Sequence, residues 1–173
     1  MASTTKIMTL LVALKYGNPS DIVTFSSYAA KEPDVQLNAL KGEQYTLNEL
    51  LYLMMLRSYN DVAMMVAEYV GGVLNGDTSP NNTTEESKED VKRFIDEMNG
   101  YAVKLGLSDT YFVTPNGLDG EDEGGIHSTT AYELALIARE ALKSEEVIKI
   151  CTTKSFSYRE QNGKRSGTIT NGN

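Results

Sequence analysis

Apolar residues recur at helical spacing close to the start of the chain. They stand at positions i, i+3, i+4 and i+7: Ile7, Leu10, Leu11 and Leu14. This spacing predicts an amphipathic helix over about Ser3–Tyr16, and Gly17-Asn18-Pro19 cannot continue it. The next segment, Asp21–Tyr45, has no helical period, so we expect an irregular connection with one short strand at Ile22–Phe25.

A polar break divides the most apolar part of the chain. Thr46-Leu47-Asn48-Glu49 has the capping-box pattern, in which a hydroxyl and a carboxylate each satisfy a free backbone amide, and it predicts a helix over Leu47–Arg57. That helix is apolar almost all round and must be buried on most sides. After Ser58-Tyr59-Asn60-Asp61, a second apolar helix is expected over Val62–Val70, with Gly71-Gly72 as its stop.

The remaining sequence alternates loops with amphipathic helices. The expected elements are a solvated loop over Asn75–Asp90 that contains Pro80 and ends in an acidic helix start, helical spacing that continues from Val91 up to Gly106, a long loop over Ser108–Ser128, a capping-box helix over Thr130–Lys143, a short helix over Ser144–Ile150, and a hairpin whose strands flank the turn dipeptide Asn162-Gly163. The pattern therefore predicts one mainly α domain over residues 1–173 with a small β-hairpin.

Composition excludes several function classes. The chain has 173 residues, of which 40% are hydrophobic and 23% charged, and this suits a folded domain. Its formal net charge of −8 leaves no basic surface for nucleic acid. Because Cys151 and His127 are each the sole residue of their type, we predict no disulfide framework, no metal site and no cofactor. Catalysis would then depend on Ser, Thr, Lys, Asp, Glu or Tyr.

Membrane and export signals are also missing from the sequence pattern. No run of about 18 apolar residues occurs, so we predict no membrane-spanning helix. Lys6 followed by Ile7–Val12 resembles a leader, but no small-residue cleavage site follows Leu14-Lys15-Tyr16. We interpret this segment as a structural helix rather than a signal peptide.

Two short motifs carry the candidate chemistry. Ser3 and Lys6 stand three residues apart and share one helix face; a desolvated lysine can take the proton of a serine nucleophile. Taken alone, an N-cap serine beside a solvated lysine explains the same residues. Ser58-Tyr59-Asn60 adds a second hydroxyl and a carboxamide at the polar break, although a helix end followed by an Asn N-cap would also explain it.

Together and in this order, the motifs resemble those of the low-molecular-mass D-alanyl-D-alanine carboxypeptidases, the penicillin-binding serine peptidases of peptidase family S11. The resemblance covers nearly the whole chain through Ala2–Thr9, Ser58–Ala63, Leu105–Leu107, Phe112–Asp119, His127–Thr130 and Asn171–Asn173. It implies the helical portion of a β-lactamase/transpeptidase-like α+β domain. It further implies a family that acts outside the cytoplasm, on peptidoglycan stem peptides ending in D-Ala-D-Ala, and that β-lactams acylate.

The resemblance also implies a role for each motif residue. Ser3 would be the acylated nucleophile, Lys6 the general base, Ser58 a proton relay, and Asn60 the residue that holds the substrate's penultimate carbonyl. The family's third motif, Lys-Thr-Gly or Lys-Ser-Gly, is absent. Arg165-Ser166-Gly167 fits it superficially, but it precedes Asn171-Gly172-Asn173 instead of following it.

The departures from the family pattern lead to two hypotheses. The strands that precede the nucleophile are missing as well, so we expect a gene fragment, a mispredicted reading frame or a trimmed chain with impaired or absent turnover. The alternative is a catalytically silent helical module that binds peptidoglycan peptides or self-associates through uncovered apolar surface. A class A β-lactamase is disfavoured because Tyr59 stands where that class usually has Asp.

Two further features are interpreted as structural. We expect His127 to be a hydrogen-bonding or surface histidine rather than a catalytic base. The acidic run Asp119–Glu123 partly imitates a calcium loop, but the twelfth position is Thr130 rather than Glu, so we expect a solvated loop.

Overall fold

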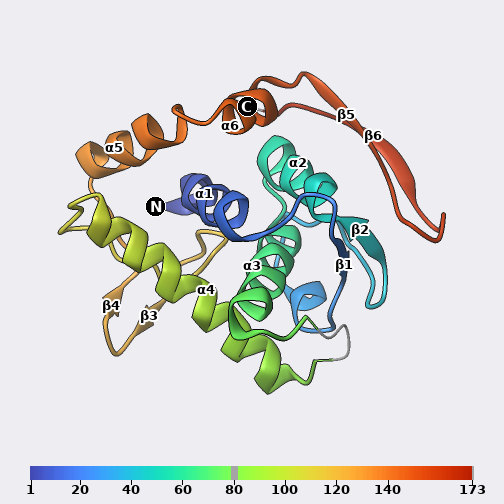
Figure 1. Ribbon diagram of the computed structural model, residues 1–173, viewed down its shortest axis with the longest axis horizontal. Helices are drawn as coiled ribbons and strands as arrows, with labels where there is room; N and C mark the ends of the chain where they lie inside the picture. Colours follow the sequence, from blue (N-terminus) through green and yellow to red (C-terminus); the bar gives the residue numbers. More distant parts are fainter. Residues whose placement is uncertain (79–81, 173) are drawn as a thin grey trace.

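Helices make up most of the protein, as the computed structural model shows for residues 1–78 and 82–172 (Figure 1). The described helices are a 3-10 turn η1 (Ala2–Thr5), α1 (Lys6–Tyr16), a 3-10 turn η2 (Ala29–Lys31), α2 (Leu47–Arg57), α3 (Asn60–Asn75), α4 (Thr84–Lys104), α5 (Ala131–Ala141) and α6 (Glu145–Thr152). The prediction of a mainly α fold with a small hairpin is confirmed. No helix in the described residues combines the length and apolarity needed to cross a bilayer.

Three antiparallel strand pairs accompany these helices. They are β1 (Ile22–Thr24) with β2 (Gln44–Thr46), β3 (Glu121–Asp122) with β4 (Gly125–Ile126), and β5 (Ser155–Arg159) with β6 (Ser166–Thr170). The short strand expected near Ile22 is confirmed. Its partner β2, at the end of the same connection, and the β3–β4 pair inside the expected long loop are too short to leave a period-2 signal.

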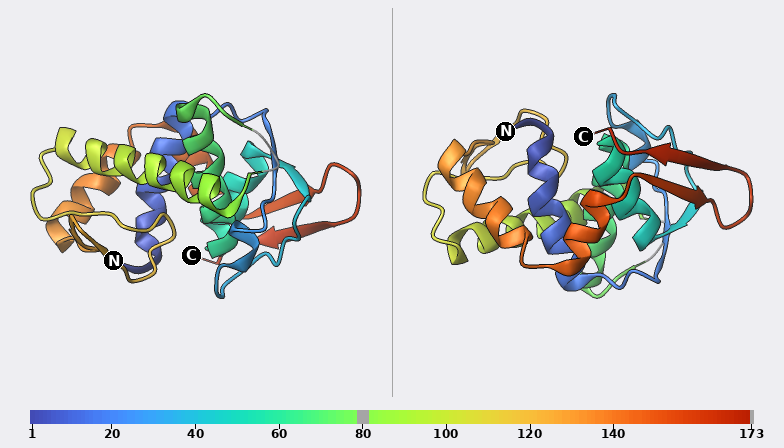
Figure 2. Two further views of the ribbon diagram at one scale, coloured as in Figure 1. Left: turned by 90° about the horizontal axis from the view of Figure 1, so that it is seen from below. Right: turned by 90° about the horizontal axis from the view of Figure 1, so that it is seen from above.

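The core lies where α1, α2 and α3 pack against one another, with α4 crossing beneath α3 (Figures 1 and 2). Helix α2 has the predicted bounds because Thr46 and Glu49 form the expected reciprocal cap. Fully buried side chains from all three helices fill the core, including Leu10, Leu50, Leu53, Met54, Val62 and Val66. The prediction that the helix over Leu47–Arg57 is buried on most sides is confirmed.

The expected stop of α3 at Gly71-Gly72 is wrong. The helix runs on to Asn75 and ends at Gly76, which has a φ of 80° and the left-handed conformation typical of a helix C-terminus. A Cβ on Gly71 would lie 1.8 Å from the backbone oxygen of Asp90. Gly71 therefore serves the close approach of α4 rather than the termination of its own helix.

Two helix starts also differ from expectation. Helix α4 begins at Thr84, inside the expected loop, because Thr83 and Glu86 form a capping box; Pro80 lies outside the described residues. At the start of α5, Thr130 accepts from the Glu133 amide, but the Glu133 carboxylate does not return to Thr130. It binds the Asp109 amide and the Thr110 hydroxyl instead, so tertiary contacts replace half of the predicted box.

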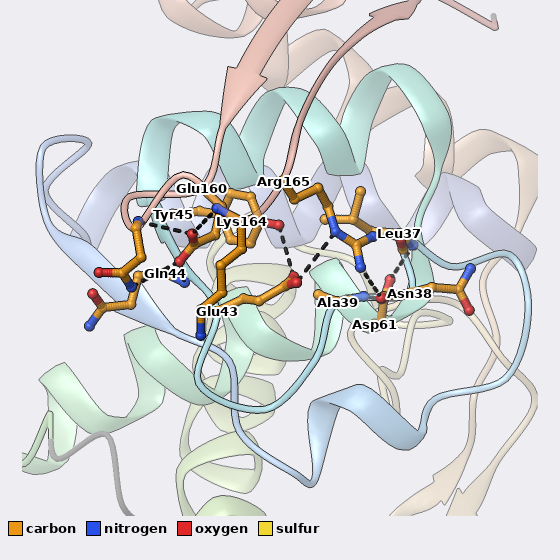
Figure 3. Close-up of polar contacts among 11 residues, drawn as sticks. Leu37, Asn38, Ala39, Glu43, Gln44, Tyr45, Asp61, Glu160, Lys164 and Arg165 are labelled. Carbon is orange, nitrogen blue, oxygen red and sulfur yellow. Dashed lines mark hydrogen bonds and ion pairs between the residues drawn. The ribbon is translucent and has the colours of Figure 1, made fainter.

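The β5–β6 hairpin is fastened to the start of β2 (Figure 3). The buried Glu160 carboxylate accepts from the Gln44 amide at 3.0 Å and from the Lys164 amide at 3.1 Å, and it organises a connection over residues 160–165. The expected two-residue turn at Asn162-Gly163 is therefore wrong, since the strands pair only outside this longer loop. Both views in Figure 2 place the hairpin tip at the opposite end of the molecule from the N-terminus.

We predict that Gly71→Ala destabilises the protein although alanine is the better helix former. The new methyl group must displace the Asp90 backbone, and overpacking of this kind costs roughly 1–3 kcal/mol. Gly100→Ala is the matched control, because a Cβ at Gly100, inside α4, would meet nothing within 4 Å and should stabilise by up to about 1 kcal/mol. Urea unfolding of both variants measures the difference, and equal stabilisation would contradict the packing role of Gly71.

Candidate active site

Lys6 lies at the centre of the candidate site, with 2% of its surface exposed. Its Nζ donates to Ser3 Oγ at 3.1 Å, to Asn60 Oδ1 at 2.9 Å and to the Asn116 carbonyl oxygen at 2.7 Å. Within the described part of the chain no carboxylate forms an ion pair with it. Burial therefore lowers the pKa of Lys6 to about 8. The solvated-lysine interpretation of Ser3 and Lys6 is wrong.

Ser3 stands in the 3-10 turn η1, one turn before Lys6, and is exposed. It opens onto a pocket of about 350 Å³ whose lining is mostly apolar: Ser3, Thr4, Lys6, Ile7, Met54, Met55, Ser58 and Cys151. The turn positions the serine because η1 continues directly into α1, whose other face is buried in the core. The Ser3 hydroxyl and the Lys6 amine, which both line the pocket, are thus within hydrogen-bonding distance of each other.

Ser58 lines the same pocket from the C-terminal end of α2. It has a φ of 61°, a left-handed conformation that is uncommon for serine and that ends the helix. Its buried Oγ has no hydrogen-bond partner among the described residues. A buried hydroxyl without a partner costs stability, and such groups concentrate at sites that await a ligand or serve a reaction.

Asn60 is the first residue of α3, not the N-cap that its sequence pattern suggested. Its Oδ1 accepts from Lys6, and its Nδ2 donates to the carbonyls of Pro33 at 3.2 Å and Asp34 at 3.0 Å. Both ends of the carboxamide are therefore engaged with the protein. The structure brings Asn60 to Lys6, and it points the Nδ2 atom toward the 33–34 backbone.

The segment Pro115-Asn116-Gly117 closes the site, and the sequence alone suggested no chemical role for it. Besides the Asn116 carbonyl on Lys6, the Pro115 carbonyl accepts from Thr9 Oγ1 at 2.6 Å. Gly117 has a φ of 91°, and a Cβ there would lie 1.9 Å from the Ala2 carbonyl oxygen. Pro-Asn-Gly is typical of a loop, but its contact with α1 could not be derived because backbone carbonyls leave no signature in the sequence.

His127 joins this segment to η1. Its Nδ1 accepts from the Val113 amide at 2.9 Å, so the proton of the neutral ring is on Nε2, which lies 3.0 Å from Thr5 Oγ1 and donates to it. Burial, with a smaller contribution from the N-terminal ammonium, lowers the pKa of His127 to about 4. The prediction of a structural hydrogen-bonding histidine is confirmed.

Two other expectations concern residues away from the pocket. In the acidic run, Asp122 accepts from the Gly124 amide at 2.8 Å within an exposed turn, as expected for a solvated loop. Arg165 donates from Nη1 to the Leu37 carbonyl and from Nη2 to the Asn38 carbonyl, both at 2.8 Å (Figure 3). Its guanidinium thus holds the β5–β6 hairpin against the 37–38 backbone, and Arg165 does not line the pocket that contains Ser3.

The arrangement is suited to nucleophilic acyl transfer. Two neutral acceptors, Asn60 Oδ1 and the Asn116 carbonyl, can take both hydrogens of an uncharged Lys6 amine. The lone pair then faces Ser3 Oγ, so the amine can remove the serine proton as the oxygen attacks. A depressed lysine pKa provides the uncharged form near neutral pH.

Comparison with known proteins identifies related chains. The family model described as D-alanyl-D-alanine carboxypeptidase, Peptidase_S11, matches residues 1–78 and 84–173. D-alanyl-D-alanine carboxypeptidase DacF of Bacillus subtilis is 35% identical over 169 residues, which cover 95% of this chain and 38% of DacF. DacB2 of Mycobacterium tuberculosis is 30% identical, with 95% of this chain and 50% of DacB2 covered.

Solved structures of similar proteins share the fold. The DD-transpeptidase of Streptomyces K15 superposes with a TM-score of 0.79 at 29% identity, covering 99% of this chain and 64% of that protein. A D-alanyl-D-alanine carboxypeptidase of Mycobacterium tuberculosis gives a TM-score of 0.79 at 27% identity, covering 99% and 57%. The chain spans half or less of the length of the two curated relatives and less than two thirds of these structures.

We predict that the stability contributed by His127 is lost as the pH falls from about 6.5 to about 4. The folded state keeps this ring neutral to a pKa of about 4, whereas the unfolded chain binds a proton near 6.5, so acid favours unfolding by roughly 3 kcal/mol. The measurement is urea unfolding of the wild type and His127→Gln across this pH range.

The test is the difference in unfolding free energy between the wild type and His127→Gln at each pH, rather than the pH profile of either protein alone. Burial raises the pKa values of Asp61 and Glu68, and these groups favour the folded state as the pH falls. Their contribution is common to both proteins and cancels. A stability difference that does not change between pH 7 and pH 4 would contradict the assigned tautomer and burial of His127.

Proposed function

The chain belongs to the D-alanyl-D-alanine carboxypeptidase family, and from that membership we propose that it carries the catalytic centre of a serine D-Ala-D-Ala carboxypeptidase. The substrate is a peptidoglycan stem peptide ending in D-Ala-D-Ala, which places the enzyme in the cell envelope. A β-lactam would acylate the same serine. The observation that carries the proposal is the buried Lys6 amine, which lies 3.1 Å from Ser3 Oγ.

The proposed reaction proceeds through an acyl-enzyme. Ser3 Oγ attacks the carbonyl carbon between the two D-alanines while Lys6 Nζ takes the hydroxyl proton. The tetrahedral intermediate collapses, the C–N bond breaks, and the leaving D-alanine nitrogen receives a proton. Water then attacks the ester, which releases the shortened peptide as a carboxylic acid and restores the Ser3 hydroxyl.

Ser58 and Asn60 assist this reaction in different ways. Ser58 Oγ lines the pocket and has no partner among the described residues, so it is available to carry the proton from Lys6 to the leaving nitrogen. Asn60 orients Lys6 through Oδ1. Holding the penultimate carbonyl of the substrate as well would require Nδ2 to release one of its two backbone acceptors, Pro33 or Asp34.

The family's third motif, Lys-Thr-Gly or Lys-Ser-Gly, has a further part in this reaction. That motif would supply an oxyanion donor and a cation for the substrate carboxylate, and the loss of one oxyanion donor costs about 10²–10³ in rate. The Arg165 guanidinium binds the carbonyls of Leu37 and Asn38, so Arg165 does not supply this cation.

We predict that a fluorescent penicillin labels the chain on Ser3 and that labelling accelerates as the pH rises to about 8. The acceleration follows from deprotonation of Lys6, whose pKa is about 8. Ser3→Ala should abolish labelling, and Lys6→Gln should slow it by about 10²–10⁴. Lys15→Gln is the matched control, because Lys15 is an exposed lysine on the same helix.

Each outcome of the labelling experiment has a distinct meaning. Labelling that persists in Ser3→Ala would place the acylation elsewhere and contradict the proposal. A folded chain that shows no labelling at high penicillin concentration would favour the silent helical module. Exposed large apolar side chains, such as Leu40 and Val103, come from separate segments, and mass measurement in solution would then show whether they mediate self-association.

We also predict that Ser58→Ala slows acylation without a loss of stability. The variant removes a buried hydroxyl that has no partner among the described residues, so the free energy of unfolding should stay equal or rise by about 1 kcal/mol, while the missing relay lowers the labelling rate at least about tenfold. Ser87→Ala is the contrasting control, since Ser87 Oγ donates to Glu68 at 2.8 Å away from the pocket and its loss should cost stability alone. Unaltered labelling by Ser58→Ala would exclude the relay.

A further inference from the structure

Besides Ser3, Asn60 and Asn116 accept hydrogen bonds from Lys6. One short loop holds both of these residues in place. This 32–39 loop contributes the carbonyls of Pro33 and Asp34 to Asn60 Nδ2. At its start, the Glu32 carboxylate accepts from Asn116 Nδ2 at 2.6 Å. Asn60 and Asn116 are in turn the two neutral acceptors of the Lys6 amine.

Through Asn116, the contact with Glu32 restricts the position of a carbonyl that Lys6 binds. Its side chain is held at both ends, by Glu32 on Nδ2 and by the Leu118 amide, which donates to Oδ1 at 3.0 Å. Its own carbonyl accepts from Lys6 Nζ at 2.7 Å, and the residue is 1% exposed. Because one buried residue makes all these contacts, the direction of the carbonyl depends on where Glu32 holds the side chain.

Hydrogen bonds also fix the far end of the 32–39 loop, so Glu32 lies at the start of a segment that is held at both ends. Asp61 accepts from the amides of Leu37 at 2.9 Å and Ala39 at 3.3 Å. Arg165 binds the carbonyls of Leu37 and Asn38 (Figure 3).

Glu32 acts on Lys6 through Asn116 and not by charge. The two side chains, both in the described part of the chain, form no ion pair, and burial is the cause of the lowered pKa of Lys6. Burial also raises the pKa of Glu32; the Asn116 amide opposes this shift, and the neighbouring Asp61 carboxyl adds to it. The phenol of Tyr28 is the other titratable group that interacts with Glu32.

We propose that Glu32 is a positioning residue for the Lys6 amine, which it orients through the Asn116 carbonyl. Its importance for catalysis rests on the function proposed above, whereas its effect on Lys6 can be measured without any reaction. The proposal assigns the 32–39 loop, which carries no motif of its own, to the support of the site.

The test is a pH titration of the full chain with ¹³C at the lysine ε carbons, followed by NMR. The Lys6 signal is identified by its absence in Lys6→Gln and should titrate near pH 8. In Glu32→Ala the loosened Asn116 segment admits water, and the midpoint should rise by about one pH unit toward the ordinary value. Glu32→Gln keeps an acceptor oxygen for Asn116 and should retain the wild-type midpoint.

A second pair of variants distinguishes the positioning role of Glu32 from a general loss of structure. Asn116→Ala removes the side chain that Glu32 holds and adds no charge beside Lys6, so it should raise the Lys6 midpoint as Glu32→Ala does, and the double variant should show no further rise. Glu85→Ala is the control, because Glu85 is an exposed acid on α4 that pairs with Lys88. Where the chain is acylated by penicillin, Glu32→Ala should also label several-fold more slowly at pH 7.

The outcomes separate this proposal from the proposed function. A wild-type Lys6 midpoint in folded Glu32→Ala would overturn the positioning role, even if that variant were less stable. A further rise of the midpoint when Glu32→Ala is added to Asn116→Ala would overturn it too. A wild-type chain that is not acylated by penicillin would contradict the proposed function alone, because the titration still reports on Lys6.

Discussion

The burial of the Lys6 amine among neutral oxygens is the constraint on which the site depends. A buried ammonium without a counter-charge is costly, so the protein must either supply close acceptors or let the amine lose its proton. Here it does both, since three oxygens lie within 3.1 Å of Nζ and burial lowers the pKa to about 8. The acceptors come from positions 3, 60 and 116, which only the packing of η1, α3 and the 113–118 segment brings together.

Much of the surrounding structure keeps these three acceptors in place. His127 ties the 113–118 segment to η1, and the Thr9 hydroxyl ties it to α1, through hydrogen bonds. Gly117 permits the close approach of that segment to the chain just before the serine. The site also retains unfavourable features, namely the Ser58 hydroxyl, which has no partner in the described structure, and its left-handed backbone. Such features persist where neighbouring packing overdetermines the conformation, and they are typical of sites that bind or react.

The predictions from sequence that proved wrong have a common physical origin in contacts between distant residues. Gly71 has the usual composition of a helix stop, but its role is set by the backbone of Asp90 on another helix. Glu133 has the spacing of a capping box, but the Asp109 amide and Thr110 hydroxyl compete successfully for its carboxylate. Asn162-Gly163 is a common hairpin turn, but Glu160 gathers the surrounding amides into a longer loop. Local patterns could not show any of these partners.

By itself, the sequence determined the helical character, the bounds of α2, and the pairing of Ser3 and Lys6 on one turn, because these features depend on local periodicity and on capping within four residues. The order of its motifs was also sufficient to indicate the family. Only the tertiary structure decided that Lys6 is buried without a carboxylate among the described residues, that Asn116 supplies a backbone acceptor, and that Glu32 holds Asn116. These properties arise from backbone carbonyls and desolvation, which depend on how distant segments pack and not on residue type.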